Sequence, residues 1–258
     1  HALPSRDTAT AVGAVSFDDV SFGYGEDHLI LRNFSLTIAP GESVALVGAT
    51  GAGKSTVVRL LLRFYDVVNG RITLDGIDLR RLDVHELRRN VGVVFEDTFL
   101  FNDTVRNNIA FAKPDADQAT VERAARLAGA HEFILQLPNG YDTPIGERGF
   151  SLSGGQRQRV AIARAIVADP RVLVLDDATS AVDPSKEHEI RDAMQTVMKG
   201  RTTIVIAHRP GTIALADRIV FIDDGGVAAV GQHRELLETS QRYREVLASF
   251  VDESSVGN

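Results

Sequence analysis

The sequence predicts an α/β fold with a mostly parallel β-sheet, an antiparallel β layer near the N-terminus and a helical lobe inserted into the α/β core. Three patterns support this class: alternating strands near the N-terminus, continuous apolar strands later, and a stretch from about residue 103 to 168 with little strand character. The chain has 258 residues and 44% of them are hydrophobic. This composition is sufficient for a domain with a substantial core.

The antiparallel layer is predicted from period-two spacing. Residues 14–24 read AVSFDDVSFGY, with Val15 and Phe17, then Val20 and Phe22, two residues apart. The change of register between the two pairs indicates a half-buried, bulged strand. The segments LRNFSLTIA and GRITLDG alternate in the same way.

The later strands have a different hydrophobic pattern. ESVALVG, RVLVLDD, TTIVIAH and RIVFIDD are short, almost continuously apolar and rich in Val and Ile. Such strands are typical of a parallel sheet covered on both faces. Helices are expected between them, and others in the lobe, at residues 54–64, 116–135, 156–168, 184–198 and 234–238.

Composition limits the class of partner. The net charge of −7 argues against nucleic acid, which needs clustered Lys and Arg. There is no cysteine, which excludes disulfides and thiolate zinc sites, and no apolar run approaches the ~20 residues of a membrane span. Polar ends predict a linker remnant at 1–13 and a flexible tail at 251–258, leaving the domain at 14–250.

One motif predicts a phosphate cradle. Residues 48–55, GATGAGKS, fit G-x-x-x-x-G-K-[ST] and stand between an apolar strand and a helical pattern. The glycines let backbone N–H groups surround an anion, and the helix N-terminus adds positive potential. Lys54 would reach the outer phosphates and the Ser55 hydroxyl would ligate Mg²⁺. The expected nucleotide-binding residues here are Gly48, Thr50, Gly51, Ala52, Gly53, Lys54, Ser55 and Thr56.

Two acids end the apolar strand RVLVLDD. Burying Asp176 and Asp177 is costly without a cation or hydrogen-bond partners. Asp176 is therefore expected to be a Mg²⁺ ligand of the P-loop site. For Asp177 two roles stay open: it belongs to the nucleotide site, or it caps the next turn.

The stretch SLSGGQRQRV carries a second signal. Ser153 and Gln156 fit a capping box at a helix start, but a cap does not require Gly154 and Gly155. Glycines at a helix N-terminus suit the close approach of an anion. Since residues 48–55 already provide one phosphate site, this second anion is most simply a nucleotide held on another molecule.

The order of these motifs resembles that of the nucleotide-binding domains of ATP-binding cassette (ABC) transporters. The segments that carry the resemblance are the P-loop, LSGGQ (152–156), VLVLD (172–176), SAVD (180–183) and AHR (207–209). IGERG (145–149) resembles the exporter-branch segment that meets the coupling helices of the membrane domain. The resemblance covers nearly the whole chain.

The resemblance implies a head-to-tail dimer that clamps two ATP molecules. Each would be held by the P-loop of one domain and by the signature of the other, Ser153, Gly154, Gly155 and Gln156. The expected partners are a second nucleotide-binding domain and the transmembrane domains. The expected place is the cytoplasmic face of the cell membrane, where ATP hydrolysis would drive substrate export.

The resemblance also assigns single residues. Tyr24 would stack on adenine, although it shares strand parity with Val20 and Phe22 and a core position stays open. His208 would be the switch histidine that bonds the γ-phosphate. Asp183 would communicate across the dimer or cap the following helix, and the two roles are compatible.

Two positions depart from the family pattern. Asp177 stands where a glutamate normally polarises the attacking water, and Glu96 stands where a glutamine contacts Mg²⁺. We expect the catalytic set to be Asp177, His208 and Glu96, and the metal ligands to be Ser55, Glu96 and Asp176. The shorter Asp177 favours a weak site in one half of a heterodimer. The alternatives are a soluble cassette ATPase and a regulatory half that mainly binds ATP.

Overall fold

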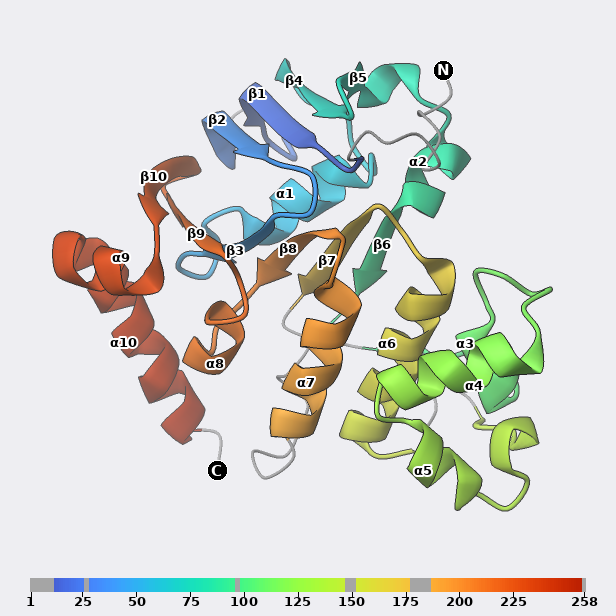
Figure 1. Cartoon of the computed structure of the whole chain (residues 1–258). Coiled ribbons are helices and arrows are strands. Elements are labelled where there is room, and N and C mark those ends of the chain that lie inside the picture. The colour runs from blue at the N-terminus through green and yellow to red at the C-terminus, as the bar shows by residue number, and fades with distance from the viewer. Residues whose placement is uncertain (1–11, 26–27, 96–97, 147–151, 177–186, 257–258) are drawn as a thin grey trace. The chain divides into compact units, whose positions relative to one another are not determined.

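The computed structural model describes residues 12–25, 28–95, 98–146, 152–176 and 187–256. It divides into two compact units. The first contains residues 1–91 and 200–258, and the second contains residues 92–199. Figure 1 traces both units along the chain.

The predicted antiparallel layer is present in the first unit. Strands β1 (Val15–Phe22), β2 (Leu31–Ile38), β4 (Asn69–Leu74) and β5 (Ile77–Asp78) form an antiparallel sheet in the order β2-β1-β4-β5 (Figure 1). The pairing of β1 with β2 shifts register between Phe17 and Val20, which confirms the predicted bulge. Asp19, inside this shift, has a positive φ of 51°.

The parallel strands of the first unit flank the strand that precedes the P-loop. Strand β3 (Ser43–Val47) is completely buried and runs parallel to β8 (Thr202–Ile206) and to β9 (Arg218–Asp223). Strand β10 (Gly226–Gly231) is antiparallel to β9. Helix α1 (Lys54–Leu61) follows β3 directly, as the motif predicts. The strands of the first unit thus agree with the predicted α/β class.

The remaining helical elements of this unit lie on either side of the second unit in sequence. The 3₁₀ turn η1 (Leu79–Arg81) and helix α2 (Val84–Asn90) precede it. Helices α8 (Pro210–Ile213), α9 (His233–Thr239) and α10 (Gln241–Val256) follow it. Helix α10 continues past residue 250, the predicted end of the domain, so residues 251–256 of the expected tail are helical.

The second unit contains the helices of the expected lobe. They are α3 (Val105–Ile109), α4 (Gln118–Leu127), α5 (His131–Leu135), the 3₁₀ turn η2 (Gly140–Asp142) and α6 (Gly154–Ala168). Both α3 and α4 pack on α6. Strand β7 (Val172–Asp176) and helix α7 (Glu187–Met198) complete the unit, and β6 (Val91–Val94) crosses into it from the first. Over the described ranges, no helix combines the length and the hydropathy of a membrane span.

Candidate nucleotide-binding site

The phosphate cradle, residues 48–55, has a backbone that only glycine fits at two positions. A Cβ on Gly48 would lie 2.4 Å from the carbonyl oxygen of Ile222. Gly53 is the N-cap of α1, with a φ of 104°, and a Cβ there would lie 2.6 Å from the Cδ2 of Leu31. No described side chain caps α1. Helix α1 therefore presents its positive N-terminal end to an anion without a side-chain cap in between.

Lys54 is folded into the cradle. Its side chain is buried, with 6% of the residue exposed. Its Nζ donates to the carbonyl oxygen of Gly48 at 2.6 Å and to that of Ala49 at 3.0 Å. A buried ammonium needs such partners, and here they hold its positive charge inside the loop. This arrangement places a cation where a phosphate would bind.

A cavity of about 380 Å³ opens on the cradle. This volume lies in the range of small-molecule and cofactor sites. Its lining residues come from the β1 end, the residue before β2, the cradle, α1 and the β8 end: Tyr24, Ile30, Thr50, Gly51, Gly53, Lys54, Ser55, Thr56, Arg59 and His208. Gly48 does not line it, and Ala52 lines a neighbouring cavity of about 220 Å³ instead. The structure therefore gathers most of the expected nucleotide-binding residues of the first unit at one cavity.

Tyr24 lies at the rim of this cavity and not in the core. Strand β1 ends at Phe22, and Tyr24 is 48% exposed. This exposure excludes the core position that strand parity left open. The Tyr24 hydroxyl lies 3.2 Å from the Oγ1 of Thr56, and the Nη1 of Arg59 donates to it at 2.9 Å. An aromatic face beside a phosphate cradle is suited to a nucleotide base.

His208 follows the end of β8 and is half-buried. It lines the same cavity as Lys54 and Ser55. Its ring centroid lies 4.9 Å from that of Phe250 in α10, at an interplanar angle of 68°. Helix α10 thus supports the histidine from the side.

The signature helix start is in the second unit. The Ser153 Oγ accepts from the Gln156 N–H at 3.3 Å, and the Gln156 Oε1 accepts from the Ser153 N–H at 2.9 Å. The predicted capping box is therefore confirmed. Ser153 is exposed, and Gly154 is half-buried beside it. Gly155, also half-buried, completes a small surface at the positive end of a long helix.

The expected metal ligands are only partly described. Ser55 is exposed in the first turn of α1, and Asp176 is half-buried at the end of β7. Glu96 and Asp177, like Asp183, lie outside the described residues, and their roles stay predictions. In the described ranges there is no group of three or more His, Cys, Asp or Glu residues poised for a metal. A serine hydroxyl and a carboxylate are nevertheless hard oxygen donors of the kind that Mg²⁺ prefers.

Sequence reasoning missed two polar residues near these motifs. Arg59 reaches Tyr24 from α1 and lines the cavity. Gln158, buried in α6, accepts from the Thr98 hydroxyl, and its Nε2 lies 3.5 Å from the Phe95 carbonyl oxygen. Gln158 therefore links α6, the signature helix, to Phe95 and Thr98. Of these two residues, only Arg59 could have been predicted from the sequence. It stands four residues after Ser55, which places both on one face of α1.

An aromatic patch lies on the second unit, formed by Phe99, Phe101 and Phe111. All three are exposed, and Phe101 stacks on Phe111 with centroids 4.4 Å apart. The Arg164 guanidinium supports the patch, 5.6 Å from the Phe101 centroid and bonded to the Phe99 carbonyl oxygen. Burial lowers the pKa of Arg164 to about 10, so it is still protonated at neutral pH. Its hydrogen bonds to Asn108 complete the support.

We expect Gly53→Ala to weaken the cradle through the backbone. The added methyl group would meet Leu31 Cδ2 at a left-handed φ, so the loop must shift. A loss of about 1–3 kcal/mol in the free energy of unfolding is expected, with weaker ATP binding. Thermal unfolding and ATP titration measure both. Gly41→Ala is the control, because its φ is also positive but a Cβ there meets nothing within 4 Å. Equal losses in both variants would show that the contact with Leu31 is irrelevant.

A buried strand, a loop that requires glycine and a helix start with a buried lysine define a P-loop nucleotide-binding domain. The family model described as "ABC transporter" matches residues 31–180. The chain belongs to the ABC transporter family. This confirms the resemblance and the α/β class inferred from the sequence.

The chain is similar to a flippase, to a secretion/processing protein and to a solved exporter. It is 49% identical over 237 residues to the ATP-dependent lipid A-core flippase of Saccharophagus degradans, covering 92% of this chain and 40% of the relative. It is 51% identical over 243 residues to the cyclolysin secretion/processing ATP-binding protein CyaB of Bordetella pertussis, covering 94% and 34%. A solved bacterial Atm1-family ABC exporter with ATP bound superposes with a TM-score of 0.88 at 46% identity, covering 96% and 42%. The chain thus spans 34% to 42% of the length of these proteins.

Proposed function

We propose that this chain is the ATP-binding and ATP-hydrolysing domain that powers export by a membrane transporter. The observation that carries the proposal is the buried Lys54 ammonium in the phosphate cradle, beside a cavity that Tyr24 and His208 also line. In this proposal ATP binding closes a head-to-tail dimer, and hydrolysis with product release reopens it.

Each residue of the cavity has a chemical task in this proposal. The Tyr24 ring takes the base, while Lys54 and the N–H groups at the start of α1 hold the outer phosphates. His208 donates a hydrogen bond to the γ-phosphate. Mg²⁺, when bound by Ser55, Asp176 and Glu96, would neutralise charge on the phosphate oxygens. Asp177 would orient the attacking water.

The signature acts on the partner's nucleotide. Ser153 and Gly155 would contact the γ-phosphate held by the P-loop of a second nucleotide-binding domain. Two features support this: the exposed Ser153 cap, and the glycine at the first helical position, where an anion can approach closely. A nucleotide between two domains would be the link that closes the dimer.

The aromatic patch is a candidate surface for the transmembrane domains. Phe99, Phe101 and Phe111 are exposed rings on one unit, and such patches mark interaction sites. Ile145 lies close to this patch. Its N–H donates to the Asp103 carbonyl oxygen at 3.1 Å, and the Asp103 N–H donates to the Phe101 carbonyl oxygen at 2.8 Å. One relative is a solved ABC exporter, so we place the domain on the cytoplasmic face of the membrane, and the net charge of −7 argues against a nucleic-acid partner.

The proposal is tested with the natural full-length protein that carries this domain. We expect it to be recovered with membranes and, in lipid vesicles, to hydrolyse ATP at a rate that depends on the added Mg²⁺. A protein that hydrolyses ATP but is recovered only in the supernatant would instead support a soluble cassette ATPase. A protein that binds ATP without cleaving it in a single turnover would support a regulatory half.

We expect Asp177→Glu to raise ATP turnover. The aspartate is one methylene shorter than the usual glutamate, and a misplacement of about 1 Å can cost about 100-fold in rate. Our hypothesis is that this P-loop builds the weak site of a heterodimer, while the intact signature completes the competent site. Turnover of the isolated chain, of Asp177→Glu and of Asp177→Asn as a control measures the effect. Brisk turnover by the unmodified chain would contradict the hypothesis.

We expect Glu96→Gln to reduce the dependence of nucleotide affinity on Mg²⁺. A carboxylate can ligate Mg²⁺, but it adds negative charge beside a triphosphate that Asp176 and Asp177 are also expected to face. ATP titrations with Mg²⁺ and with a chelator give the ratio of affinities, which should be larger for the unmodified chain. Identical ratios would mean that Glu96 does not face the nucleotide.

A further inference from the structure

Three aromatic rings meet where β1 ends beside the segment that follows α1. We call Phe22, Tyr24 and Tyr65 the aromatic triad. The Tyr24 centroid lies 5.1 Å from that of Phe22 and 5.2 Å from that of Tyr65, at interplanar angles of 86° and 82°. Phe22 and Tyr65 are 5.5 Å apart. Edge-to-face contacts of this kind hold ring orientations by more than burial alone.

The Tyr24 hydroxyl is held by the P-loop helix. Arg59 donates to it at 2.9 Å, with its guanidinium carbon 5.8 Å from the Tyr24 centroid, and Thr56 Oγ1 lies 3.2 Å away. Both partners are on α1, whose first residue is Lys54. The hydroxyl therefore fixes one end of the ring relative to the phosphate cradle. The ring body is fixed by Phe22, which is buried, and by Tyr65, which is 45% exposed.

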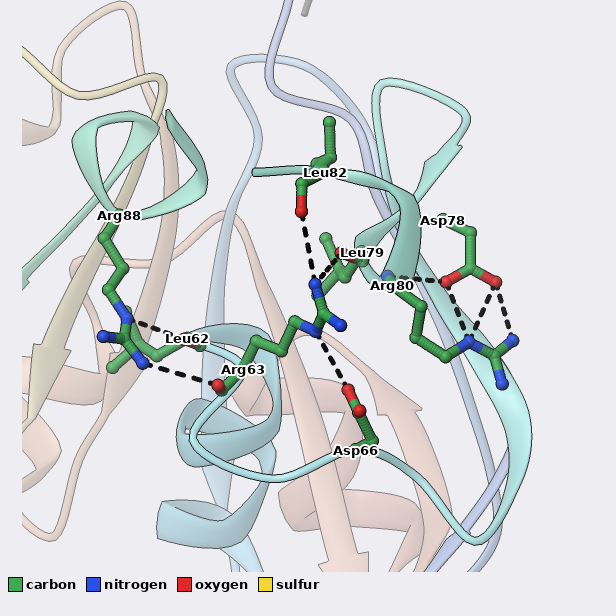
Figure 2. A network of polar contacts seen from close by, with 8 residues as sticks. All are labelled: Leu62, Arg63, Asp66, Asp78, Leu79, Arg80, Leu82 and Arg88. Carbon is green, nitrogen blue, oxygen red and sulfur yellow. Dashed lines mark hydrogen bonds and ion pairs between the residues drawn. The ribbon is translucent and has the colours of Figure 1, made fainter. Parts of the chain in front are cut away.

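The segment that leads into Tyr65 is anchored at the end of α1, and Figure 2 shows the contacts of Arg63 there. Arg63, with a φ of 51°, donates from Nη1 to the carbonyl oxygens of Leu79 at 3.0 Å and Leu82 at 3.2 Å, and from Nε to Asp66 at 3.0 Å. Tyr65 lies between Arg63 and Asp66 in sequence. The ion pair between Arg63 and Asp66 therefore restrains the short backbone segment that contains Tyr65.

A second arginine secures the same segment from α2. Arg88 donates from Nε to the Leu62 carbonyl oxygen at 3.2 Å and from Nη2 to that of Arg63 at 3.4 Å (Figure 2). Its guanidinium carbon lies 4.8 Å from the Phe64 ring centroid. These bonds satisfy carbonyl groups at the helix C-terminus, where cations are favoured. The segment before Tyr65 is thus tied down at three successive residues.

We propose that Tyr65 is a positioning residue that holds the Tyr24 ring in the orientation that receives the nucleotide base. It does not line the cavity, so it acts through Tyr24. This inference rests on the proposed function and deepens it: Tyr65 sets the share of affinity that depends on the base, while the cradle sets the share that depends on the phosphates.

The test compares two ligands by titration calorimetry: ATP and inorganic tripolyphosphate, which has no base. We expect Tyr65→Ala to weaken ATP binding by about threefold to tenfold, the scale of one aromatic pair, and to leave tripolyphosphate binding unchanged. The retained tripolyphosphate binding also shows that the variant is folded. Tyr65→Phe keeps the ring and should bind ATP as the unmodified chain does. Unchanged ATP affinity in Tyr65→Ala, or an equal loss for both ligands, would overturn the proposal.

A double-mutant cycle shows whether Tyr65 acts through Tyr24. In a chain that already carries Tyr24→Ala, the further change Tyr65→Ala should not weaken ATP binding again. A second loss of the same size would show an independent role and would overturn the inference. The proposed function has a separate readout, because its failure would appear as unchanged ATP and tripolyphosphate binding in Lys54→Ala.

Discussion

Replacing Lys54 with alanine is expected to lower the ATP affinity of the isolated chain by about 100-fold and to abolish the slow ATP hydrolysis at its own P-loop. The change removes the ammonium held inside the cradle and leaves the carbonyl oxygens of Gly48 and Ala49 without this donor. Truncating one member of a buried, hydrogen-bonded charge pair costs about 2–5 kcal/mol, and a 100-fold loss lies within that range. Titration calorimetry and phosphate release measure the two effects.

Two comparisons separate this effect from general damage. Lys113→Ala removes an exposed lysine from the second unit, and it should leave ATP affinity unchanged. Lys54→Arg keeps the charge but not the compact ammonium that fits between two carbonyl groups, so it should also bind weakly. If Lys54→Ala bound ATP as well as the unmodified chain, the cradle would not be the nucleotide site.

Changing Ser153 to aspartate is expected to leave ATP binding by one isolated chain intact and to lower hydrolysis by the assembled transporter by about 100-fold or more. Aspartate is a good N-cap, so α6 should still begin at Gly154. The new carboxylate would face the partner's γ-phosphate and repel it, where the serine would donate. Loss of one donor to a developing anion costs about 100- to 1,000-fold in rate.

The control for this change keeps the cap without the charge. Ser153→Thr retains a hydroxyl that can cap the helix and bond to phosphate, so most activity should remain. Phosphate release by the assembled transporter and ATP titration of the isolated chain are measured for both variants. Full hydrolysis in Ser153→Asp would mean that the start of α6 does not meet a nucleotide.

Much of the fold could be predicted because the strands have clear patterns. The bulge in β1 follows from the change of register after Phe17, and β3, β8 and β9 follow from their continuous apolar runs. Helix α10 was missed although its pattern is present. Tyr243, Val246, Leu247 and Phe250 stand at helical spacing, and all four are buried. The expectation of a frayed end, based on polar composition, concealed this pattern.

Strand β10 was missed for a different reason. Its sequence, GVAAVG, is weakly hydrophobic and has glycine at both ends. It pairs with β9 because Asp224 and Gly225, both with positive φ, form the short connection between them. The dipeptide Asp-Gly is a hairpin signal that could have been read from the sequence.

For the site, motifs predicted most of the residues that line the cavity, but not how they are held. The glycine spacing and Lys54 are local features, so a short stretch of sequence defines the cradle. The contacts of Tyr24 with Arg59 and Tyr65 join segments 35 and 41 residues apart, and no local pattern encodes them. Similarly, the bond between Thr98 and Gln158 depends on how the second unit folds.

The central claim is that one nucleotide lies between the P-loop of one chain and the signature of another. Because the sequence contains no cysteine, two introduced cysteines can report this contact. Each copy of this chain carries both a P-loop and a signature, so a second copy can take the partner's place in the test. Chains with Thr50→Cys are therefore mixed with chains with Ser153→Cys, and a short thiol-specific bifunctional reagent is added. Arg234→Cys replaces Ser153→Cys in the control, since that side chain is 91% exposed on α9.

The decisive measurement is the yield of covalent dimer in this mixture with and without ATP and Mg²⁺. We predict a strong increase on addition of ATP for the Thr50–Ser153 pair and none for the Thr50–Arg234 pair. The same yield with and without nucleotide, or an equal yield from both pairs, would contradict the shared site.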